Sequence, residues 1–249
     1  MAFSADEISI DAFLGGRLSI RQPKTGYRAA TDPVLLAAAC PAQIGESVLD
    51  LGCGVGTAGL CLARRIDVSV TGLELQGDYA ALARDNATAN EISMDVIEGD
   101  LAQMPPALRD RSFDHVITNP PFFAHGTKAN DAGRARARQE AVGLPLWIDS
   151  GLRRLKPKGW LTLILTIDRL PEVIVSLNER AGSLKIKPLS ARAGRPAGRF
   201  LLCARKGGRA PTTLYNPLIL HEGSVHEGDF DSYTKEARSV LREAQVIDF

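Results

Sequence analysis

A short apolar run, a cluster of glycines and a helical pattern follow one another between residues 47 and 66, and this order constrains the fold most. Residues 47–53, SVLDLGC, form the kind of apolar run that is typical of a buried parallel strand. In residues 57–66, TAGLCLARRI, apolar side chains recur at mostly helical spacing. The intervening glycines let the backbone turn tightly and leave no Cβ in the way of a ligand. The segment predicts a strand, a tight turn and a helix, with a ligand at the turn.

The same alternation of strand and helix continues along the chain. Further strands are predicted at 68–74, 94–100, 112–119, 159–166, 183–191 and 199–207, and helices at 77–91, 144–156 and 169–180. Alternating elements of this kind build right-handed crossovers, so the fold class is α/β: a doubly wound, mostly parallel, seven-stranded Rossmann-like sheet. The last two strands lack a helix between them and are expected to form an antiparallel hairpin. Ligands in such sheets bind outside the carboxyl ends of the strands.

Composition places the chain among single-domain globular proteins. Its 249 residues, 45% of them hydrophobic, suffice for one large α/β domain. The chain has no run of about 18 apolar residues, and its first residues carry acids where a signal peptide carries basic residues. We therefore expect a cytoplasmic protein with no membrane partner. The four cysteines are scattered without a C-x-x-C pair, which disfavours a metal site or disulfides, and Cys53 is interpreted as a compact filler rather than a nucleophile.

Carboxylates stand at the ends of the first three predicted strands: Asp50, Glu74 and Asp100. Residues 54–59, GVGTAG, match the dinucleotide template G-x-G-x-x-G, but Asp50 would repel a pyrophosphate and suits a ligand that carries an ammonium group. Glu74 can accept both hydroxyls of a ribose, and Asp100 can accept the amine of an adenine. Each acid alone is equally well explained as a helix N-cap or turn residue. Three in succession favour a nucleoside ligand with a cationic group over NAD.

The fourth strand ends in Asn119, Pro120, Pro121 and Phe122. Successive prolines lock the backbone and remove both N–H donors, and Phe122 offers a face on which a planar base can stack. The Asn119 amide oxygen and the Pro120 carbonyl could together hold the two hydrogens of an exocyclic amine, which favours a more tetrahedral nitrogen that can attack a methyl group. A merely rigid turn is the alternative.

Together, DLGCGVG, Glu74, Asp100 and NPPF resemble the class I S-adenosylmethionine-dependent amino-methyltransferases. Residues 22–39, 134–146 and 195–209 are similar to the bacterial tRNA1(Val) adenine N6-methyltransferase subgroup. The resemblance implies three parts: an N-terminal segment with a cofactor-capping helix (1–40), the methyltransferase domain (41–210) and a C-terminal extension (211–249). It also implies S-adenosylmethionine as cofactor and S-adenosylhomocysteine as product, with no metal.

The resemblance further implies roles for individual residues. Asp50, Gly52, Cys53, Gly54 and Gly56 would surround the methionine part of the cofactor, Glu74 the ribose, and Asp100 with Leu75 and Leu101 the adenine. Tyr27 and Thr31 would close over the methionine end, with Asp32 nearby, and Asn119 would face both cofactor and target base. The family usually has His where this chain has Gln139, and the resemblance assigns that residue no role.

Charge is unevenly distributed along the chain and points to an RNA partner. From Lys185 to Arg209 there are eight basic residues and no acid, although the net charge is only +1. Such a stretch can follow phosphates, with a solvated edge as the alternative. The candidate RNA contacts are Arg134, Arg136 and Arg138 in the long loop 120–143, together with Arg195 and Arg199. His125 in that loop is interpreted as an exposed residue rather than a base.

The leading hypothesis is methyl transfer to the exocyclic amine of an RNA base, most simply adenine N6 of a tRNA. The same chemistry would serve guanine N2 of ribosomal RNA, adenine in DNA or a protein glutamine. A protein that binds the cofactor without using it, and an NAD oxidoreductase, are the alternatives of a different class.

Overall fold

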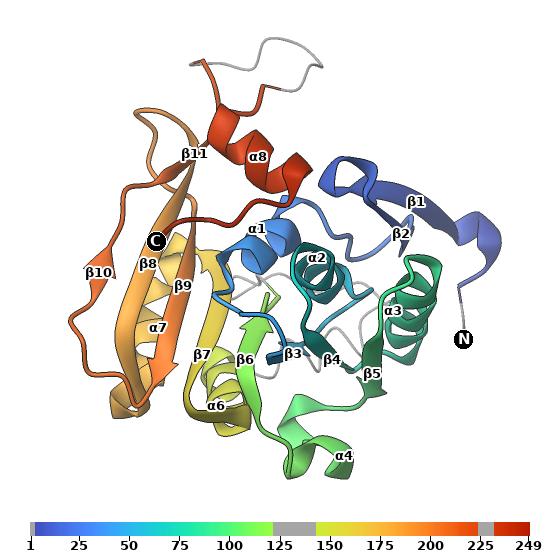
Figure 1. Cartoon of the computed structure of the whole chain (residues 1–249), viewed down its shortest axis with the longest axis horizontal. Coiled ribbons are helices and arrows are strands. Elements are labelled where there is room, and N and C mark those ends of the chain that lie inside the picture. The colour runs from blue at the N-terminus through green and yellow to red at the C-terminus, as the bar shows by residue number, and fades with distance from the viewer. Residues whose placement is uncertain (1–2, 122–142, 224–231) are drawn as a thin grey trace.

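The computed structural model describes residues 3–121, 143–223 and 232–249, and its centre is a nine-stranded sheet (Figure 1). Along the sheet the strands follow the order β10, β8, β9, β7, β6, β3, β4, β5, and β11 also pairs with β8. Their bounds are β3 Ser47–Leu51, β4 Ser69–Glu74, β5 Met94–Glu98, β6 Phe113–Thr118, β7 Leu155–Thr166, β8 Ala181–Arg192, β9 Arg199–Lys206, β10 Thr213–Leu214 and β11 Leu218–His221.

The predicted fold class is confirmed, with one addition at the edge of the sheet. Strands β3 to β7 pair in parallel, and β9 runs antiparallel between β7 and β8, as expected of the C-terminal hairpin. The sheet has nine strands rather than seven because β10 and β11 pair in parallel with the outer strand β8. Backbone N–H and C=O groups of β8 that would otherwise lie at an open edge of the sheet are thereby partly hydrogen-bonded.

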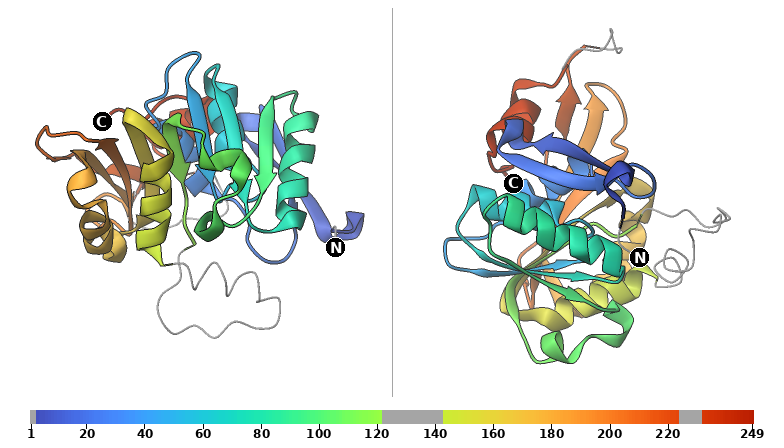
Figure 2. Two further views of the ribbon diagram at one scale, coloured as in Figure 1. Left: turned by 90° about the horizontal axis from the view of Figure 1, so that it is seen from below. Right: turned by 90° about the vertical axis from the view of Figure 1, so that its right-hand side faces the viewer.

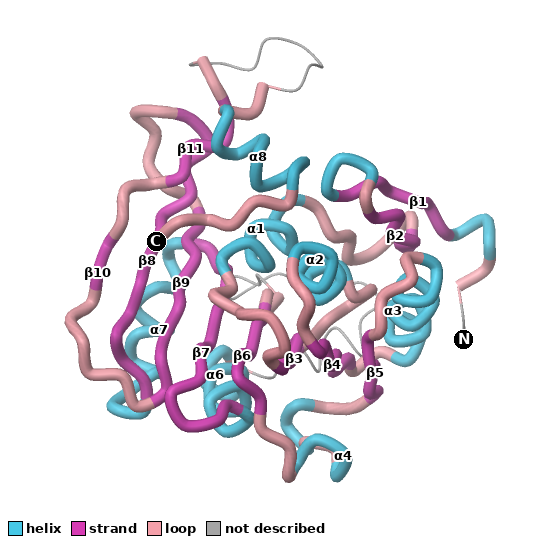
Figure 3. Tube along the Cα trace, in the orientation of Figure 1, coloured by secondary structure: helices cyan, strands magenta, loops and turns pink. Residues whose placement is uncertain are grey.

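Helices cover both faces of the sheet, as Figures 2 and 3 show. Their bounds are α1 Thr31–Ala39, α2 Thr57–Arg65, α3 Gly77–Ala89, α4 Pro106–Arg109, α6 Leu144–Arg154, α7 Leu170–Leu177 and α8 Lys235–Glu243. Because alternate strand residues point to opposite faces, Val48 packs into the core beneath α1 and α2 and Leu49 into the core beneath α6 and α7. No helix in the described ranges is long and apolar enough to span a membrane.

An N-terminal hairpin, absent from the sequence-based prediction, packs beside α3 (Figure 1). It consists of β1, Ile8–Phe13, and β2, Leu18–Pro23, paired antiparallel. Two buried asparagines complete the backbone of β2: Asn86 of α3 bonds the N–H and C=O of Arg21, and Asn90, which caps the end of α3, bonds those of Ser19. The hairpin is thus fixed to the domain and leads into the segment that enters α1.

Element ends differ from the sequence-based ranges where the backbone takes a left-handed conformation. Helix α7 ends at Leu177 because the next residue, Asn178, has φ 48°. The expected turn at 157–159 instead lies within β7, where Lys158 has φ 68° and the register with β6 shifts. Pro106 is the first residue of the short helix α4.

Candidate active site

The turn between β3 and α2 is built by glycines in the left-handed region. Gly52, Gly54 and Gly56 have φ of 76°, 56° and 86°, a conformation that residues with a Cβ rarely adopt. Gly59 lies inside α2, and a Cβ there would come within 2.9 Å of Val70 Cγ1 on β4. The glycines that shape the turn are therefore those counted from Asp50, and Gly59 serves close packing of helix on sheet.

Asp50 holds this turn together from the end of β3. Its carboxylate is buried, with the residue 2% exposed, and Oδ2 accepts the backbone N–H of Gly59 over 3.0 Å. Burial raises the pKa of the Asp50 carboxyl to about 7, against the effect of that hydrogen bond and with a contribution from the nearby Glu74 carboxylate. A cation placed beside the Asp50 carboxyl would lower its pKa, because the cation stabilises the ionised form.

Glu74, at the end of β4, braces the same turn from the other side. Its Oε2 accepts the N–H of Gly54 and its Oε1 the N–H of Gln76, both over 2.9 Å. The side chain is buried, which raises the pKa of the carboxyl, and these backbone hydrogen bonds oppose the rise. Each carboxylate oxygen has a second lone pair, so the predicted acceptance of ribose hydroxyls is compatible with both contacts.

A first cavity opens at the carboxyl ends of β4 and β5, on one side of Gly52. It is lined by Leu73, Leu75, Gly99, Asp100, Leu101 and Trp147, with Gly52 between it and the rest of the site. Asp100 Oδ1 caps the short helical turn after β5 by accepting the N–H of Ala102 over 2.8 Å. Leu75, Leu101 and Asp100, the predicted adenine contacts, thus line one cavity, and their contact with an adenine stays a prediction.

Trp147 is a site residue that sequence reasoning missed. It lies on α6, is 2% exposed, and its ring rests against Gly52, where an added Cβ would fall 2.5 Å from ring atom Cη2. In the sequence it is one more apolar residue on the buried face of an amphipathic helix. Only the tertiary packing brings it under the glycine turn.

A second cavity lies on the other side of Gly52, beneath the segment that enters α1. Its walls come from Tyr27, Ala29, Pro33, Asp50, Gly52, Cys53, Val55, Thr57, Ala58 and Asn119. Thr57, the first residue of α2, is 2% exposed, and its Oγ1 has no hydrogen-bond partner in the part of the chain that the structure describes. A buried hydroxyl without a partner is costly unless a ligand completes it, and it stands beside a helix N-terminus that favours negative groups.

The two cavities together fit a ligand with an apolar ring at one end and a zwitterion at the other. Asp50 offers an anionic partner for an ammonium group, and Thr57 with the α2 N-terminus offers donors for a carboxylate. Cys53 is buried, burial raises the pKa of its thiol well above the ordinary value, and it packs against Gly72. The interpretation of Cys53 as a compact filler agrees with this packing.

The segment that carries Tyr27 is fixed by a side chain that sequence reasoning also missed. Gln22, buried on β2, accepts the N–H of Ala29 over 2.7 Å and donates to its carbonyl over 3.3 Å. Arg28 pairs with Asp11 of β1 over 2.7 Å. These contacts place the Tyr27 ring against Gly54; its closing role over a cofactor stays a prediction.

Asn119 directly follows β6 and lines the second cavity. Its Nδ2 donates to the Tyr27 hydroxyl over 3.2 Å, and its Oδ1 is buried without a partner among the residues described. Pro120 and Pro121 follow, whereas Phe122 lies outside the described residues. The structure thus brings Asn119 together with Tyr27 and Asp50 around one cavity.

Thr31 begins α1 at the edge of this cluster, and its neighbour Asp32 forms an ion pair with Arg199 of β9. Arg199 is therefore engaged inside the chain, and burial lowers the pKa of its guanidinium. The other loop candidates for RNA contact, Arg134, Arg136 and Arg138, lie outside the described residues, as do His125 and Gln139.

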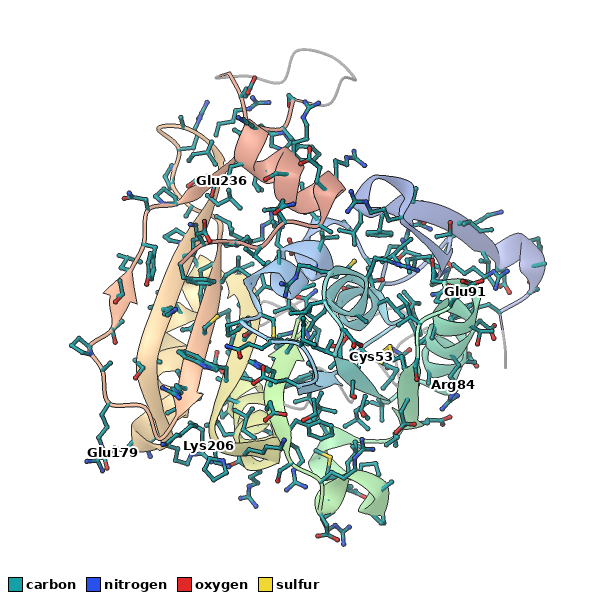
Figure 4. The ribbon with its side chains drawn as sticks, in the orientation of Figure 1. Cys53, Arg84, Glu91, Glu179, Lys206 and Glu236 are labelled. Atoms are coloured by element: carbon teal, nitrogen blue, oxygen red, sulfur yellow. The ribbon has the colours of Figure 1, made fainter. Side chains whose placement is uncertain are left out.

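The basic stretch 185–209 does not form one continuous surface. Since β8 and β9 are antiparallel, its members are divided between opposite ends of the sheet; Figure 4 shows Lys206 at one end of this strand pair and Glu236 of α8 toward the other. Most of them contact groups of the chain: Lys185 the rings of Trp160 and Phe249, Lys187 the Asp248 carbonyl, Arg192 the Glu222 carbonyl, Arg199 Asp32, Arg205 the Lys158 carbonyl and Lys206 the Leu155 carbonyl.

Arg195 and Arg209 are the two members of this stretch that are exposed and have no partner in the described ranges. Arg195 lies in the turn after β8, which runs in the same direction as β7, so it sits at the edge of the sheet that carries Asp50, Glu74 and Asn119. Arg209 follows β9 and lies at the opposite edge, near Gly182. Arg195 and Arg209 carry the same charge, so only their positions distinguish them as candidate RNA contacts.

A doubly wound sheet with a glycine turn after its first core strand, acids at the ends of three strands and Asn-Pro-Pro at the fourth defines a class I methyltransferase. Residues 30–167 match the family model described as methyltransferase small domain. The chain belongs to this family and is an S-adenosylmethionine-dependent N-methyltransferase.

Curated relatives are similar over most of the chain. A protein of Shewanella sp. (strain MR-4) named tRNA1(Val) (adenine(37)-N6)-methyltransferase is 33% identical over 174 residues, covering 68% of this chain and 74% of the relative. A protein of the same name from Dickeya chrysanthemi is 28% identical over 236 residues, covering 90% of each.

Solved structures agree on the fold. A predicted O-methyltransferase from Agrobacterium tumefaciens superposes with a TM-score of 0.69 at 29% identity, covering 86% of this chain and 97% of that one. The Thermus thermophilus 16S rRNA N2 G1207 methyltransferase, solved with AdoMet and guanosine, superposes with a TM-score of 0.57 at 21% identity, covering 80% and 50%.

Proposed function

We propose that this chain methylates the N6 amino group of an adenine in tRNA, with S-adenosylmethionine as methyl donor. The observation that carries the proposal is the buried Oδ1 of Asn119, directly after β6, which has no partner among the described residues and lies beside the cavity of Tyr27 and Asp50. An acceptor left open in a buried place calls for a donor from a ligand, and an exocyclic amine supplies one. The printed names of the curated relatives support adenine N6 and tRNA.

The residues around Gly52 would hold the cofactor by its two ends. The cavity of Leu75, Leu101, Trp147 and Asp100 would receive the adenine, and Glu74 the ribose hydroxyls. Asp50 would bind the ammonium and Thr57, with the α2 N-terminus, the carboxylate of the methionine part. When bound, S-adenosylmethionine supplies a methyl group on a positively charged sulfur, which takes the bonding electron pair as the methyl leaves.

Asn119 and Pro120 would prepare the amine for attack. The Asn119 Oδ1 and the Pro120 carbonyl accept its two hydrogens, which weakens delocalisation of the nitrogen lone pair into the base. After transfer the methylated nitrogen is cationic and acidic enough to release a proton to water, so the chain needs no strong base. Catalysis then comes chiefly from positioning and electrostatics.

A tRNA loop suits this site because its bases are already partly unstacked. Arg195 stands at the edge of the sheet where such a loop would approach, and Arg134, Arg136 and Arg138 remain candidate contacts on sequence grounds. Phe122 would stack on the target base. A cytoplasmic location follows from a tRNA substrate.

The test is methylation of defined RNAs by the purified protein. Wild-type protein, unmodified tRNA and labelled cofactor are expected to give N6-methyladenine in the digested tRNA, identified by a mass increase of about 14 Da on adenosine. Asn119→Ala should abolish transfer while calorimetry still shows cofactor binding, because Asn119 acts on the amine. Transfer retained by Asn119→Ala would contradict its assigned role.

Guanine N2 of ribosomal RNA is the second candidate, since a solved structure of this fold is a 16S rRNA N2 methyltransferase. DNA adenine and a protein glutamine share the same chemistry. Parallel assays on 16S rRNA, duplex DNA and a glutamine-containing release factor separate these substrates: transfer to one of them, with none to tRNA, would replace the tRNA proposal.

A further inference from the structure

The amide of Asn119 has two ends of nearly equal shape and opposite chemistry. Rotation of the amide by a half turn would exchange Oδ1, an acceptor, for Nδ2, a donor. A target amine needs the acceptor, so the site works only if something in the fold selects one orientation. The described residues contain one side chain in hydrogen-bond contact with this amide, Tyr27, through its hydroxyl.

The Tyr27 hydroxyl is itself held in place. The main-chain carbonyl of Tyr27 accepts a hydrogen bond from the Tyr79 hydroxyl over 3.4 Å. The Tyr27 ring lies over Gly54, 3.6 Å from where a Cβ on that glycine would stand. Two positions further along the chain, Ala29 is bonded in both directions to Gln22. Tyr27 is 42% exposed as a whole residue, yet its hydroxyl end is turned inward to Asn119.

A hydroxyl can donate or accept, and the neighbouring charges decide which. Burial raises the pKa of Tyr27 to about 12, against the effect of the hydrogen bond with Asn119, and the nearby carboxylates of Asp50 and Glu74 add to the rise; the hydroxyl therefore keeps its proton. Their negative field attracts the hydroxyl hydrogen and turns the oxygen lone pairs away from it. The lone pairs are then available to the Asn119 NH2, and Oδ1 is directed away from Tyr27.

We propose that Tyr27 is a positioning residue, whose hydroxyl holds the Asn119 Nδ2 and thereby presents Oδ1 to the substrate amine. The inference rests on the proposed function in one respect, the role of Asn119 Oδ1 as acceptor. It separates two tasks of Tyr27: the ring covers the cofactor cavity, and the hydroxyl orients the amide. Removal of the hydroxyl alone tests the second task.

Tyr27→Phe keeps the ring and removes the hydroxyl, so kcat for RNA methylation is expected to fall about tenfold, the equivalent of one hydrogen bond of about 1.4 kcal/mol. KM for RNA and the Kd for S-adenosylmethionine should stay within twofold of wild type. Tyr215→Phe is the matched control, because Tyr215 packs on Phe249 away from the site. A kcat within twofold of wild type for Tyr27→Phe, or a loss seen only as weaker cofactor binding, overturns the proposal.

The same substitution in an Asn119→Asp background asks whether Tyr27 acts through Asn119. A carboxylate accepts through either oxygen, so its orientation no longer matters, and Tyr27→Phe should then cost less than twofold in single-turnover rate. A persistent tenfold loss would show that the hydroxyl acts elsewhere and would overturn the proposal.

A third measurement is independent of any substrate. The side-chain NH2 resonances of Asn119 are assigned as the pair missing from the ¹⁵N spectrum of full-length Asn119→Asp. In Tyr27→Phe both resonances should shift and exchange faster with water. Unchanged resonances overturn the proposal even if the wild-type protein methylates no RNA, whereas shifted resonances with an inactive wild type would locate the failure in the proposed function.

Discussion

The ring of Trp147 lies directly against Gly52, so that a Cβ on this glycine would fall 2.5 Å from Cη2 and 2.7 Å from Cζ3. A residue of α6 thereby sets the shape of the turn that follows β3. Gly52 and Trp147 both line the first cavity. A residue of α6 therefore contributes to the wall of this cavity.

Gly52→Ala should destabilise the fold and weaken cofactor binding. The φ of 76° costs a residue with a Cβ about 1 to 2 kcal/mol, and the collision with Trp147 adds about 1 to 3 kcal/mol. Gly45→Ala is the matched control, since Gly45 has φ 81° and nothing within 4 Å of its added Cβ. Urea denaturation of both variants measures the difference; equal losses would mean that Trp147 yields without cost.

Asp50→Asn should flatten the dependence of stability on pH. Burial raises the pKa of Asp50 from 3.8 to about 7 in the folded chain, so the folded state binds more protons than the unfolded state between these values. The contribution of Asp50 to stability is therefore fully present below pH 3.8 and is lost as the pH rises through 7.

The Asn side chain does not ionise and avoids this loss. The difference in free energy of unfolding, Asp50→Asn minus wild type, should therefore be larger at pH 8 than at pH 5. Urea denaturation of both proteins at both pH values measures it. Other carboxyl groups affect both proteins alike and cancel. A gap that narrows toward pH 8 would contradict the prediction.

Thr57→Val should weaken S-adenosylmethionine binding without loss of stability. The Thr57 Oγ1 is buried and unpartnered in the described chain, so its removal sacrifices no internal hydrogen bond. If it donates to the methionine carboxylate, loss of this charge-assisted bond should raise Kd about tenfold. Calorimetry measures the Kd for S-adenosylmethionine, and thermal denaturation measures the stability of the variant.

Thr162→Val is the control variant, because the Thr162 hydroxyl contacts Cys203 of β9 within the chain rather than a ligand cavity. This variant should bind the cofactor like wild type and melt at or below the wild-type temperature. Unchanged cofactor affinity in Thr57→Val would assign its hydroxyl to packing.

Arg195→Glu and Arg209→Glu should differ in their effect on RNA binding. Both side chains are exposed and without a partner in the described residues, but Arg195 lies at the site edge of the sheet and Arg209 at the other. Arg195→Glu should raise the Kd for tRNA several-fold and make the salt slope shallower by about 0.7 to 0.9 per lost phosphate contact. Arg209→Glu should stay within twofold, and equal losses would indicate a surface that spans both edges.

The sequence predicts much of this architecture because its strongest signals are local. Apolar runs that end in Asp50, Glu74 and Asn119 mark the carboxyl ends of parallel strands, and such ends meet at one edge of a sheet. The glycines counted from Asp50 mark the turn, because a positive φ is a local requirement.

What the sequence could not predict depends on contacts between distant elements. Trp147 looks like any buried aromatic of an amphipathic helix, and Gln22 stands in a hairpin without a periodic signal strong enough to identify it. The basic residues between 185 and 209 lie close together in the sequence, but they are spread over the antiparallel strands β8 and β9 and so are separated in space. Proximity along the chain is no measure of proximity on a surface when a strand pair reverses direction between the residues.

The N-terminal hairpin that supports Tyr27 also contacts α8, more than 200 residues later in the chain. Arg17 donates to the Glu243 carbonyl over 3.0 Å across a separation of 226 residues, and Gly15 lies against the Arg242 carbonyl. Closing so long a loop costs conformational entropy before any contact repays it. On the ribosome, the hairpin can acquire this support only after residues 235–243 have been synthesised. The parallel strands and glycine turn can assemble earlier, so competence to bind the cofactor under Tyr27 should arise as a late event of biosynthesis.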